Sequence, residues 1–359
     1  MQSGRHFRAT ARGGRIARLG AEAENLAGLN MDIKRAEQKG FLLCYVLALA
    51  LVALPVAAQE MGRGPLGLTN QYPLALLHAN IVPDSSKVID GGRLEFGAIE
   101  GVANTNAQRD GYQVDAESWN TFTQAKVGLG GGVELVGRLP LLWRGAGILD
   151  GPIKGWHDLW DLPQGDRDRI DNGEYNIEGE RKDWRAFDLN KKGAGLGNAA
   201  LGLKYQLPFP DEKRIPVALL ADFSLPTATS QYGHGSVDST LGVLAGTYVG
   251  DFIFYGGIAE VIYGETETAD VLFPRSQQQG FFYTEYRLSS AWSLLAGVYG
   301  SNGSIKDVAD HPSNWGYLDL SARYQVTQVW GLDFLVREDM AGQRGTTDVA
   351  FALGVSYRT

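Results

Sequence analysis

Alternation of apolar and polar residues is clearest in the last part of the chain, between Trp315 and Tyr357. Three successive segments there place an apolar residue at every second position, with polar or small residues between them. The alternating apolar positions are Leu318, Leu320, Ala322, Tyr324 and Val326, then Leu332, Phe334 and Val336, then Val349, Phe351, Leu353, Val355 and Tyr357. A period of two predicts β-strands with one apolar face and one polar face.

The same reading predicts about twelve strands from residue 92 onward. The nine that precede the last three cover residues 93–99, 119–129, 133–143, 197–207, 216–225, 239–249, 252–263, 281–288 and 292–299. A soluble β-sandwich also alternates, so the pattern alone does not identify the solvent that surrounds the sheet.

The connections between the predicted strands alternate in length, and this indicates a membrane barrel. Long connections are expected at residues 100–118, 144–196, 226–238, 264–280 and 300–314, and short ones at 130–132, 250–251, 289–290 and 327–329. The connection at 208–215 is modest and the one at 338–346 is medium. Outer-membrane barrels have an even number of strands, short periplasmic turns and longer outer loops. We therefore predict an all-β fold, a transmembrane antiparallel up-and-down β-barrel of about 12 strands over residues 92–359.

Charged residues recur on the polar face of these strands, which a dry protein core could not hold unpaired. In a barrel surrounded by lipid this face lines the lumen. The residues expected to face the lumen and a solute path are Glu95, Lys126, Glu134, Arg138, Lys204, Asp222, Glu260, Glu285, Arg287, Asp319, Arg323, Asp333, Arg337 and Asp348.

The N-terminal part of the chain has the features of an exported protein. Basic residues precede an apolar run at residues 41–56, and small residues follow it as far as Ala58, which is typical of a secretory signal peptide. We expect a signal peptide at 31–58 that starts at Met31, and a mis-annotated or disordered leader at 1–30. Residues 59–91 contain no clear strand and are expected to form a periplasmic or plug segment.

Charge and cysteine content limit the classes of partner that we expect. The net charge is −8 and no basic stripe stands out, which argues against nucleic acid. The single cysteine, Cys44, lies within the apolar run, so the exported chain has no disulfide. The expected location is the bacterial outer membrane, and the expected partners are its lipids, the periplasmic barrel-assembly machinery and a small solute.

Candidate catalytic and metal-binding residues are sparse. Asp166, Asp168, Asp171 and Glu174 form an acidic loop without the spacing of an EF-hand. His234 and Ser236 lie two apart, but no Asn lies at a plausible position in the next strand to orient the imidazole. The remaining histidines are scattered along the sequence. We therefore expect no catalytic residues, no metal site and no cofactor.

Several blocks resemble an uncharacterised, domain-of-unknown-function family of Gram-negative outer-membrane barrels. They lie at residues 70–74, 150–157, 162–163 and 193–208. The last block, with residues 225–227 and 233–238, is also similar to barrels proposed to act in phenol-degradation pathways (MetA-type). The chain departs from the family in having Asn198 where Asp is expected, and it ends at Thr359 rather than at an aromatic residue.

Three functions remain open from the sequence. The first is a narrow passive channel or binding barrel for a small solute, which the resemblance implies is hydrophobic or aromatic. The second is a closed structural or binding barrel that acts through the 144–196 loop. The third, and the weakest, is an outer-membrane hydrolase that uses His234 and Ser236.

Overall fold

The computed structural model describes residues 62–160, 173–208, 216–303, 305–312, 314–340 and 345–359. The predicted signal peptide and leader, and the acidic residues 166–171, lie outside this part. The barrel and the segment before it belong to one compact unit, residues 54–154 and 165–359. Residues 1–53 with 155–164 form the other unit, of which the structure describes 155–160, the end of helix α2 (Asp150–Trp160).

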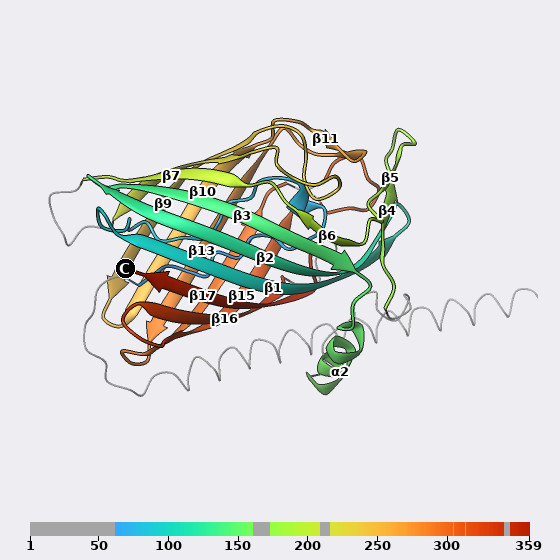
Figure 1. Ribbon diagram of the computed structural model, residues 1–359. Helices are drawn as coiled ribbons and strands as arrows, with labels where there is room; N and C mark the ends of the chain where they lie inside the picture. Colours follow the sequence, from blue (N-terminus) through green and yellow to red (C-terminus); the bar gives the residue numbers. More distant parts are fainter. Residues whose placement is uncertain (1–61, 161–172, 209–215, 304, 313, 341–344) are drawn as a thin grey trace, which may run out of the picture. The chain divides into compact units, whose positions relative to one another are not determined.

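Twelve antiparallel strands close into a barrel (Figure 1), because the first strand pairs with the last. In order around the wall they are β1 (Leu94–Arg109), β2 (Tyr112–Gly130), β3 (Val133–Gly145), β7 (Ala200–Gln206), β8 (Val217–Ser224), β9 (Asp238–Val249), β10 (Phe252–Ile262), β13 (Ser276–Arg287), β14 (Trp292–Ser301), β15 (Trp315–Gln325), β16 (Trp330–Asp339) and β17 (Val349–Arg358). The predicted fold class and strand number are confirmed.

Short turns connect the strands at one end of the barrel. Residues 131–132 join β2 to β3, and 250–251 join β9 to β10. Gly130, Gly131 and Gly132 all have positive φ angles, a conformation that glycine adopts without steric cost. The glycine run is therefore required by the hairpin.

The predicted long loop at residues 100–118 is wrong. β1 continues to Arg109 and β2 begins at Tyr112, and the two strands stay in register along this whole length. The sequence concealed the strands because buried polar residues such as Asn104 and Glu117 break the alternation there. Shorter strands extend the wall at this end: β4 (Asn176–Glu180) pairs with β2, β5 (Ala186–Asp188) with β4, and β6 (Gly193–Leu196) with β3. A separate hairpin, β11 (Glu267–Thr268) with β12 (Val271–Leu272), lies in the β10–β13 connection.

The outward face of the wall is apolar and exposed, as lipid contact requires. Its exposed side chains include Leu201, Leu241, Phe282, Phe334 and Phe351. Near the short turns, outward aromatic rings pair between neighbouring strands, at 4.6 Å for Trp292–Tyr324 and 4.9 Å for Trp330–Tyr357. These pairs lie where aromatic belts occur in membrane barrels.

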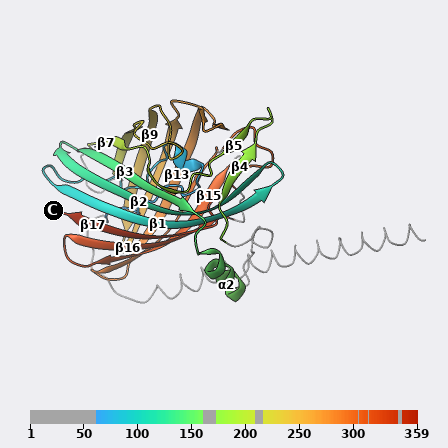
Figure 2. The same cartoon turned by 45° about the vertical axis from the view of Figure 1, so that its right-hand side comes forward.

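Residues 62–92, which we call the inner segment, run inside the barrel (Figures 1 and 2). Arg63 donates to the carbonyl of Val329 in a short turn, and Gly92 donates to the carbonyl of Gly128 near another. The middle of the segment, including the 3₁₀ turn η1 (Ala75–Leu77), lies at the opposite end, among the extensions of the wall. The segment therefore goes up the barrel and returns to the end where it started. Among the described residues, no helix is long and apolar enough to cross a membrane.

Candidate functional site

The strand register decides where each predicted lumen residue lies. All of them except Glu260 lie on the inward side of the wall, and most are buried. Glu260 instead shares the outward face of β10 with Ile258 and Ile262, and it is opposite Leu241 and Gln278. It lies near the outer end of β10, where a charged side chain can reach water beyond the lipid tails. That the inward residues line a solute path stays a prediction.

One group of inward charges surrounds Asp84 of the inner segment. The ammonium groups of Lys126 and Lys204 each lie 2.9 Å from an Asp84 oxygen. Lys204 also lies 2.9 Å from Glu134, and Lys126 lies 3.4 Å from Glu95. Strands β1, β2, β3 and β7 thus supply two cations and two carboxylates to one buried carboxylate of the segment. Buried charges are tolerated when they are paired in this way.

A second group uses arginines to hold the backbone of the inner segment. Arg323 pairs with Asp333 at 2.7 Å and donates to the carbonyl of Gly64 at 2.6 Å. Arg337 pairs with Asp319 at 2.7 Å and donates to the carbonyls of residues 68 and 69. The segment has little regular structure, so these donors satisfy carbonyls that would otherwise be buried without partners.

At the outer end the inner segment also makes extensive apolar contacts. Tyr72, Leu74 and Leu77 of the segment pack in one cluster with residues from the wall extensions and outer loops, among them Ile177 and Phe187. His311 adds a polar contact at this cluster, since its Nε2 lies 3.2 Å from the Tyr72 hydroxyl. Burial lowers the pKa of His311 to about 4, so this imidazole is neutral at pH 7.

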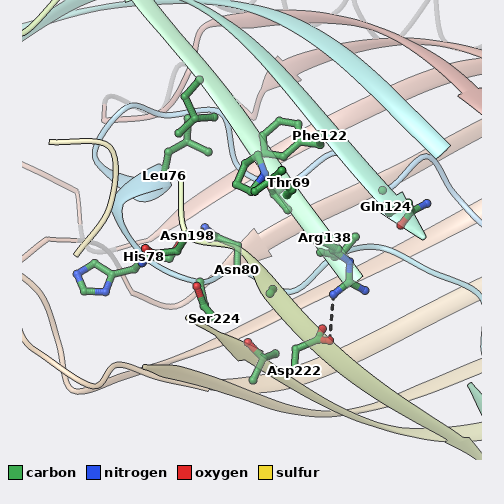
Figure 3. Close-up of a pocket in the computed structure, with 18 of the residues that line it drawn as sticks. Thr69, Leu76, His78, Asn80, Phe122, Gln124, Arg138, Asn198, Asp222 and Ser224 are labelled. Carbon is green, nitrogen blue, oxygen red and sulfur yellow. Dashed lines mark hydrogen bonds and ion pairs between the residues drawn. The ribbon is translucent and has the colours of Figure 1, made fainter. Parts of the chain in front are cut away.

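A cavity of about 100 Å³ lies between the inner segment and the wall formed by β2, β3, β7 and β8 (Figure 3). Ile99, Phe122 and Leu142 contribute apolar lining, and Gln124 and Asn198 contribute amides. Arg138 and Asp222 pair across one side of it at 2.9 Å. The inner segment forms the opposite side with residues 76–80. The cavity is thus bounded by the segment as well as by the barrel.

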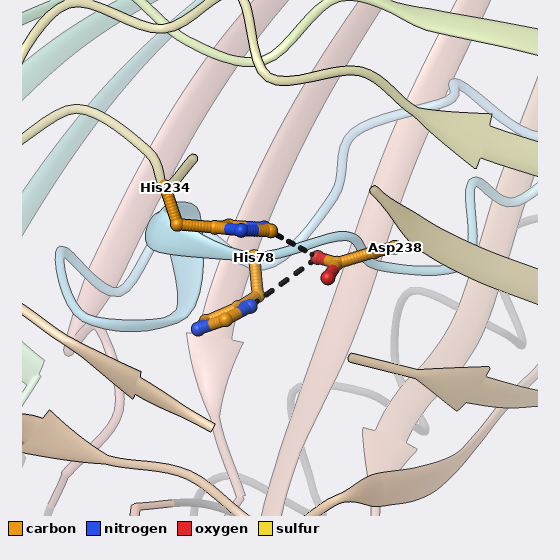
Figure 4. Close-up of side chains that lie close together, drawn as sticks. All are labelled: His78, His234 and Asp238. Carbon is orange, nitrogen blue, oxygen red and sulfur yellow. Dashed lines mark hydrogen bonds and ion pairs between the residues drawn. The ribbon is translucent and has the colours of Figure 1, made fainter. Parts of the chain in front are cut away.

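The structure brings together a group that the sequence did not indicate. His78 of the inner segment and His234 of the 225–237 loop both contact Asp238 at the start of β9 (Figure 4). The carboxylate oxygen Oδ2 lies 3.2 Å from Nδ1 of His78 and 2.8 Å from Nε2 of His234. Asp238 also accepts the backbone N–H groups of Ala79 and Gly264, at 2.8 and 3.0 Å.

The expectation that the remaining histidines are scattered is therefore wrong for His78. His78 and His234 are 156 positions apart in the sequence, and their rings stack with centroids 4.3 Å apart. The group that orients His234 is not the Asn sought in the sequence but Asp238, which contacts it from four residues away. The only sequence signal for either residue was its type, and the contact depends on the path of a segment without regular structure.

The sequence also missed Asp84, since it lies in that same segment. A carboxylate between a proline and two serines is usual in an exposed turn. Only the closed barrel shows that Lys126 and Lys204, on different strands, meet at this residue.

Comparison with known proteins identifies relatives of this fold. The model of one family, described as "Protein of unknown function (DUF3187)", matches residues 41–359. No curated protein matches the chain. The chain is similar to the solved COG4313 outer membrane channel from Pseudomonas putida F1, with a TM-score of 0.54 and 11% identity, over 78% of this chain and 100% of that one.

Two further solved structures match with lower TM-scores, which support no inference of their own. The CymD monoaromatic hydrocarbon channel has a TM-score of 0.36 and 14% identity, over 83% of this chain and 94% of that one. The P. putida toluene transporter TodX has a TM-score of 0.37 and 11% identity, over 76% and 91%.

These comparisons confirm the expected resemblance to an uncharacterised outer-membrane barrel family, and the first structure confirms the fold. The first of these structures is described as an outer membrane channel, and at 11% identity the likeness concerns the fold. A closed antiparallel barrel with an apolar outward face is the form in which β-strands cross a bilayer. The protein is accordingly a bacterial outer-membrane barrel.

Proposed function

The chain belongs to the DUF3187 family of proteins of unknown function, and from its barrel we propose a narrow channel or binding barrel for a small, largely apolar solute. The cavity beside the inner segment is the observation that carries this proposal. Its lining combines apolar side chains such as Ile99 and Phe122 with a few polar groups. Solute sites in proteins have this composition, in which apolar walls supply affinity and few polar groups fix orientation.

The arrangement of charge supports an uncharged solute. The inward cations Lys204, Arg323 and Arg337 each have an acidic partner within 3 Å. Paired charges of both signs give the interior no strong preference for anions or cations, in contrast to pores lined by charges of one sign. The inner segment occupies much of the lumen, so passage is narrow and passive.

The experiment that tests this function fills the cavity. Ala200 lines it and lies on the inward face of β7, opposite Arg138 and Ser224. In the purified full-length protein we expect Ala200→Phe to weaken binding of benzyl alcohol about tenfold or more, measured by calorimetry in detergent, since the ring occupies the same space. We also expect it to lower the small step-like currents of the protein in planar bilayers.

The matched control is Ala221→Phe. Ala221 lies on the outward face of β8, opposite the exposed residues Leu203 and Leu241, so an added ring there meets lipid. This variant should bind and conduct as the unchanged protein does. The proposal is contradicted if the unchanged protein shows neither binding nor currents, or if the two variants behave alike.

The two alternative functions gain less support. The 144–196 connection supplies Tyr175, Ile177, Phe187 and Leu189 to the outer apolar cluster, which is a structural contribution. For the hydrolase, Ser236 Oγ lies 3.1 Å from Nδ1 of His234. However, the backbone N–H of Ser236 donates to that same nitrogen at 3.3 Å, which competes with its use as a base. We propose no enzymatic activity, and esterase activity lost in Ser236→Ala would contradict this.

A further inference from the structure

Three buried side chains from two distant parts of the chain meet near the outer end of the barrel. Their ligand atoms, one from each of His78, His234 and Asp238, all lie within 4.8 Å of one another. All three residues are buried, and both imidazoles direct a ring nitrogen at the same carboxylate oxygen (Figure 4). Two imidazole nitrogens and one carboxylate oxygen form a common ligand set for zinc and related metals.

The far nitrogen of each ring also has a partner, as in established metal sites. Nε2 of His78 lies 3.3 Å from the Thr268 hydroxyl, which in turn lies 3.2 Å from a Glu265 oxygen. Nδ1 of His234 lies 3.1 Å from the Ser236 hydroxyl. These hydroxyl oxygens can accept a hydrogen bond from the far ring N–H. The lone pair of the other ring nitrogen then points toward the centre of the group. The backbone N–H groups of residues 79 and 264 hold the carboxylate in place.

We propose that His78, His234 and Asp238 bind a divalent transition metal such as Zn²⁺ or Ni²⁺, which fastens the inner segment to the barrel wall. Imidazole nitrogen favours these metals over Ca²⁺ and Mg²⁺, which prefer oxygen ligands. With three protein ligands, at least one coordination position is left for water. The inference does not depend on the identity of the solute.

Metal binding requires a neutral imidazole with a free lone pair. On binding, each ring stays neutral with its proton on the far nitrogen, which donates to the Ser236 or Thr268 hydroxyl. The contact of the Ser236 backbone N–H with His234 is given up in exchange. Without metal, the hydrogen bonds to Asp238 hold the same atoms together.

The test measures metal binding by the full-length protein, folded in detergent and treated with EDTA. Zn²⁺ is titrated in competition with a chromophoric chelator, and Co²⁺ absorbance reports the coordination geometry. We expect one saturable site per chain, and at least tenfold weaker Zn²⁺ binding in His78→Ala and His234→Ala. His311→Ala is the control, because it removes a half-buried histidine outside the group.

A conservative variant separates a metal site from a group joined by hydrogen bonds alone. The amide in His78→Gln can still donate to Asp238, so the metal-free protein should melt as the unchanged protein does, yet Zn²⁺ should no longer raise its melting temperature. The proposal is overturned if the unchanged protein shows no saturable site. It is equally overturned if folded His78→Gln and His234→Gln bind Zn²⁺ as tightly as the unchanged protein.

Discussion

The two ends of the barrel hold the inner segment by different chemistry. Near the short turns, the barrel wall contacts the segment through buried ion pairs, among them those of the Lys126 and Lys204 ammonium groups with Asp84. At the outer end, aromatic and aliphatic side chains pack around Leu74 and Leu77. An ion pair fixes position but loses much of its Coulomb energy to desolvation, whereas apolar burial stabilises without requiring one geometry. We infer that the charged end sets the register of the segment and the apolar end supplies most of its net stabilisation.

The largest effect in this comparison should come from Asp84→Ala. The change leaves two buried ammonium groups without their shared partner, and breaking a buried pair costs about 3–5 kcal/mol. We expect a loss of this size in the free energy of unfolding, measured by denaturant titration of the folded protein. Asp183→Ala removes a carboxylate that is 48% exposed, and its partner Arg181 keeps Glu267 at 3.0 Å, so this change should cost less than about 1 kcal/mol. Equal losses in the two variants would show that the Asp84 group is not buried as described.

An intermediate effect should appear at the outer end as the pH falls. The pKa of His311 is about 4 in the folded protein and about 6.5 in an exposed chain. The unfolded state therefore binds more protons between these two pH values. The free energy of unfolding does not suffer from His311 above pH 6.5, falls as the pH drops from 6.5 to 4, and is lowered by its full amount below pH 4. His311→Gln should flatten this part of the stability profile and change little at pH 8. An unchanged profile in the variant would assign the pH dependence to other groups.

The smallest effect should come from removing one methyl group in the outer cluster. Ile177 is fully buried, and Ile→Val in a packed core costs about 0.5–1.5 kcal/mol. Ile177→Val should lower the unfolding midpoint accordingly. Ile148→Val serves as its control because Ile148 is 77% exposed, so the same deletion removes no buried contact. A midpoint shift as large in the control would contradict the packing of this cluster.

The wall could be predicted from sequence because each strand has one face in lipid, and lipid enforces alternation. The prediction failed where that constraint ends. β1 and β2 continue past the bilayer as a hairpin whose buried face carries polar groups such as Asn104, so no period was visible. The prediction for Glu260 failed for a related reason, since near the outer end of β10 the outward face can carry a charged residue between apolar ones.

The interior was less accessible to the same reasoning. The alternation of side chains predicted that Lys204 and Arg337 face inward, but it did not predict their partners. Asp84 and the carbonyls of residues 68 and 69 lie in a segment that shows no alternation. The meeting of His78 with His234 is likewise a long-range contact with no local signature. Alternation along a strand predicts which face of the sheet a side chain lies on. A site also depends on which segments lie at the same height in the barrel, and alternation does not predict that.

The inner segment enters and leaves the barrel through the same mouth, with Arg63 and Gly92 both near the short turns. Over residues 62–92 it is therefore a folded-back loop and not a thread. The loop can be drawn out without parting any two neighbouring strands, at the cost of side-chain contacts alone. During folding the barrel can therefore close first, and the inner segment can enter it afterwards from the side of the short turns.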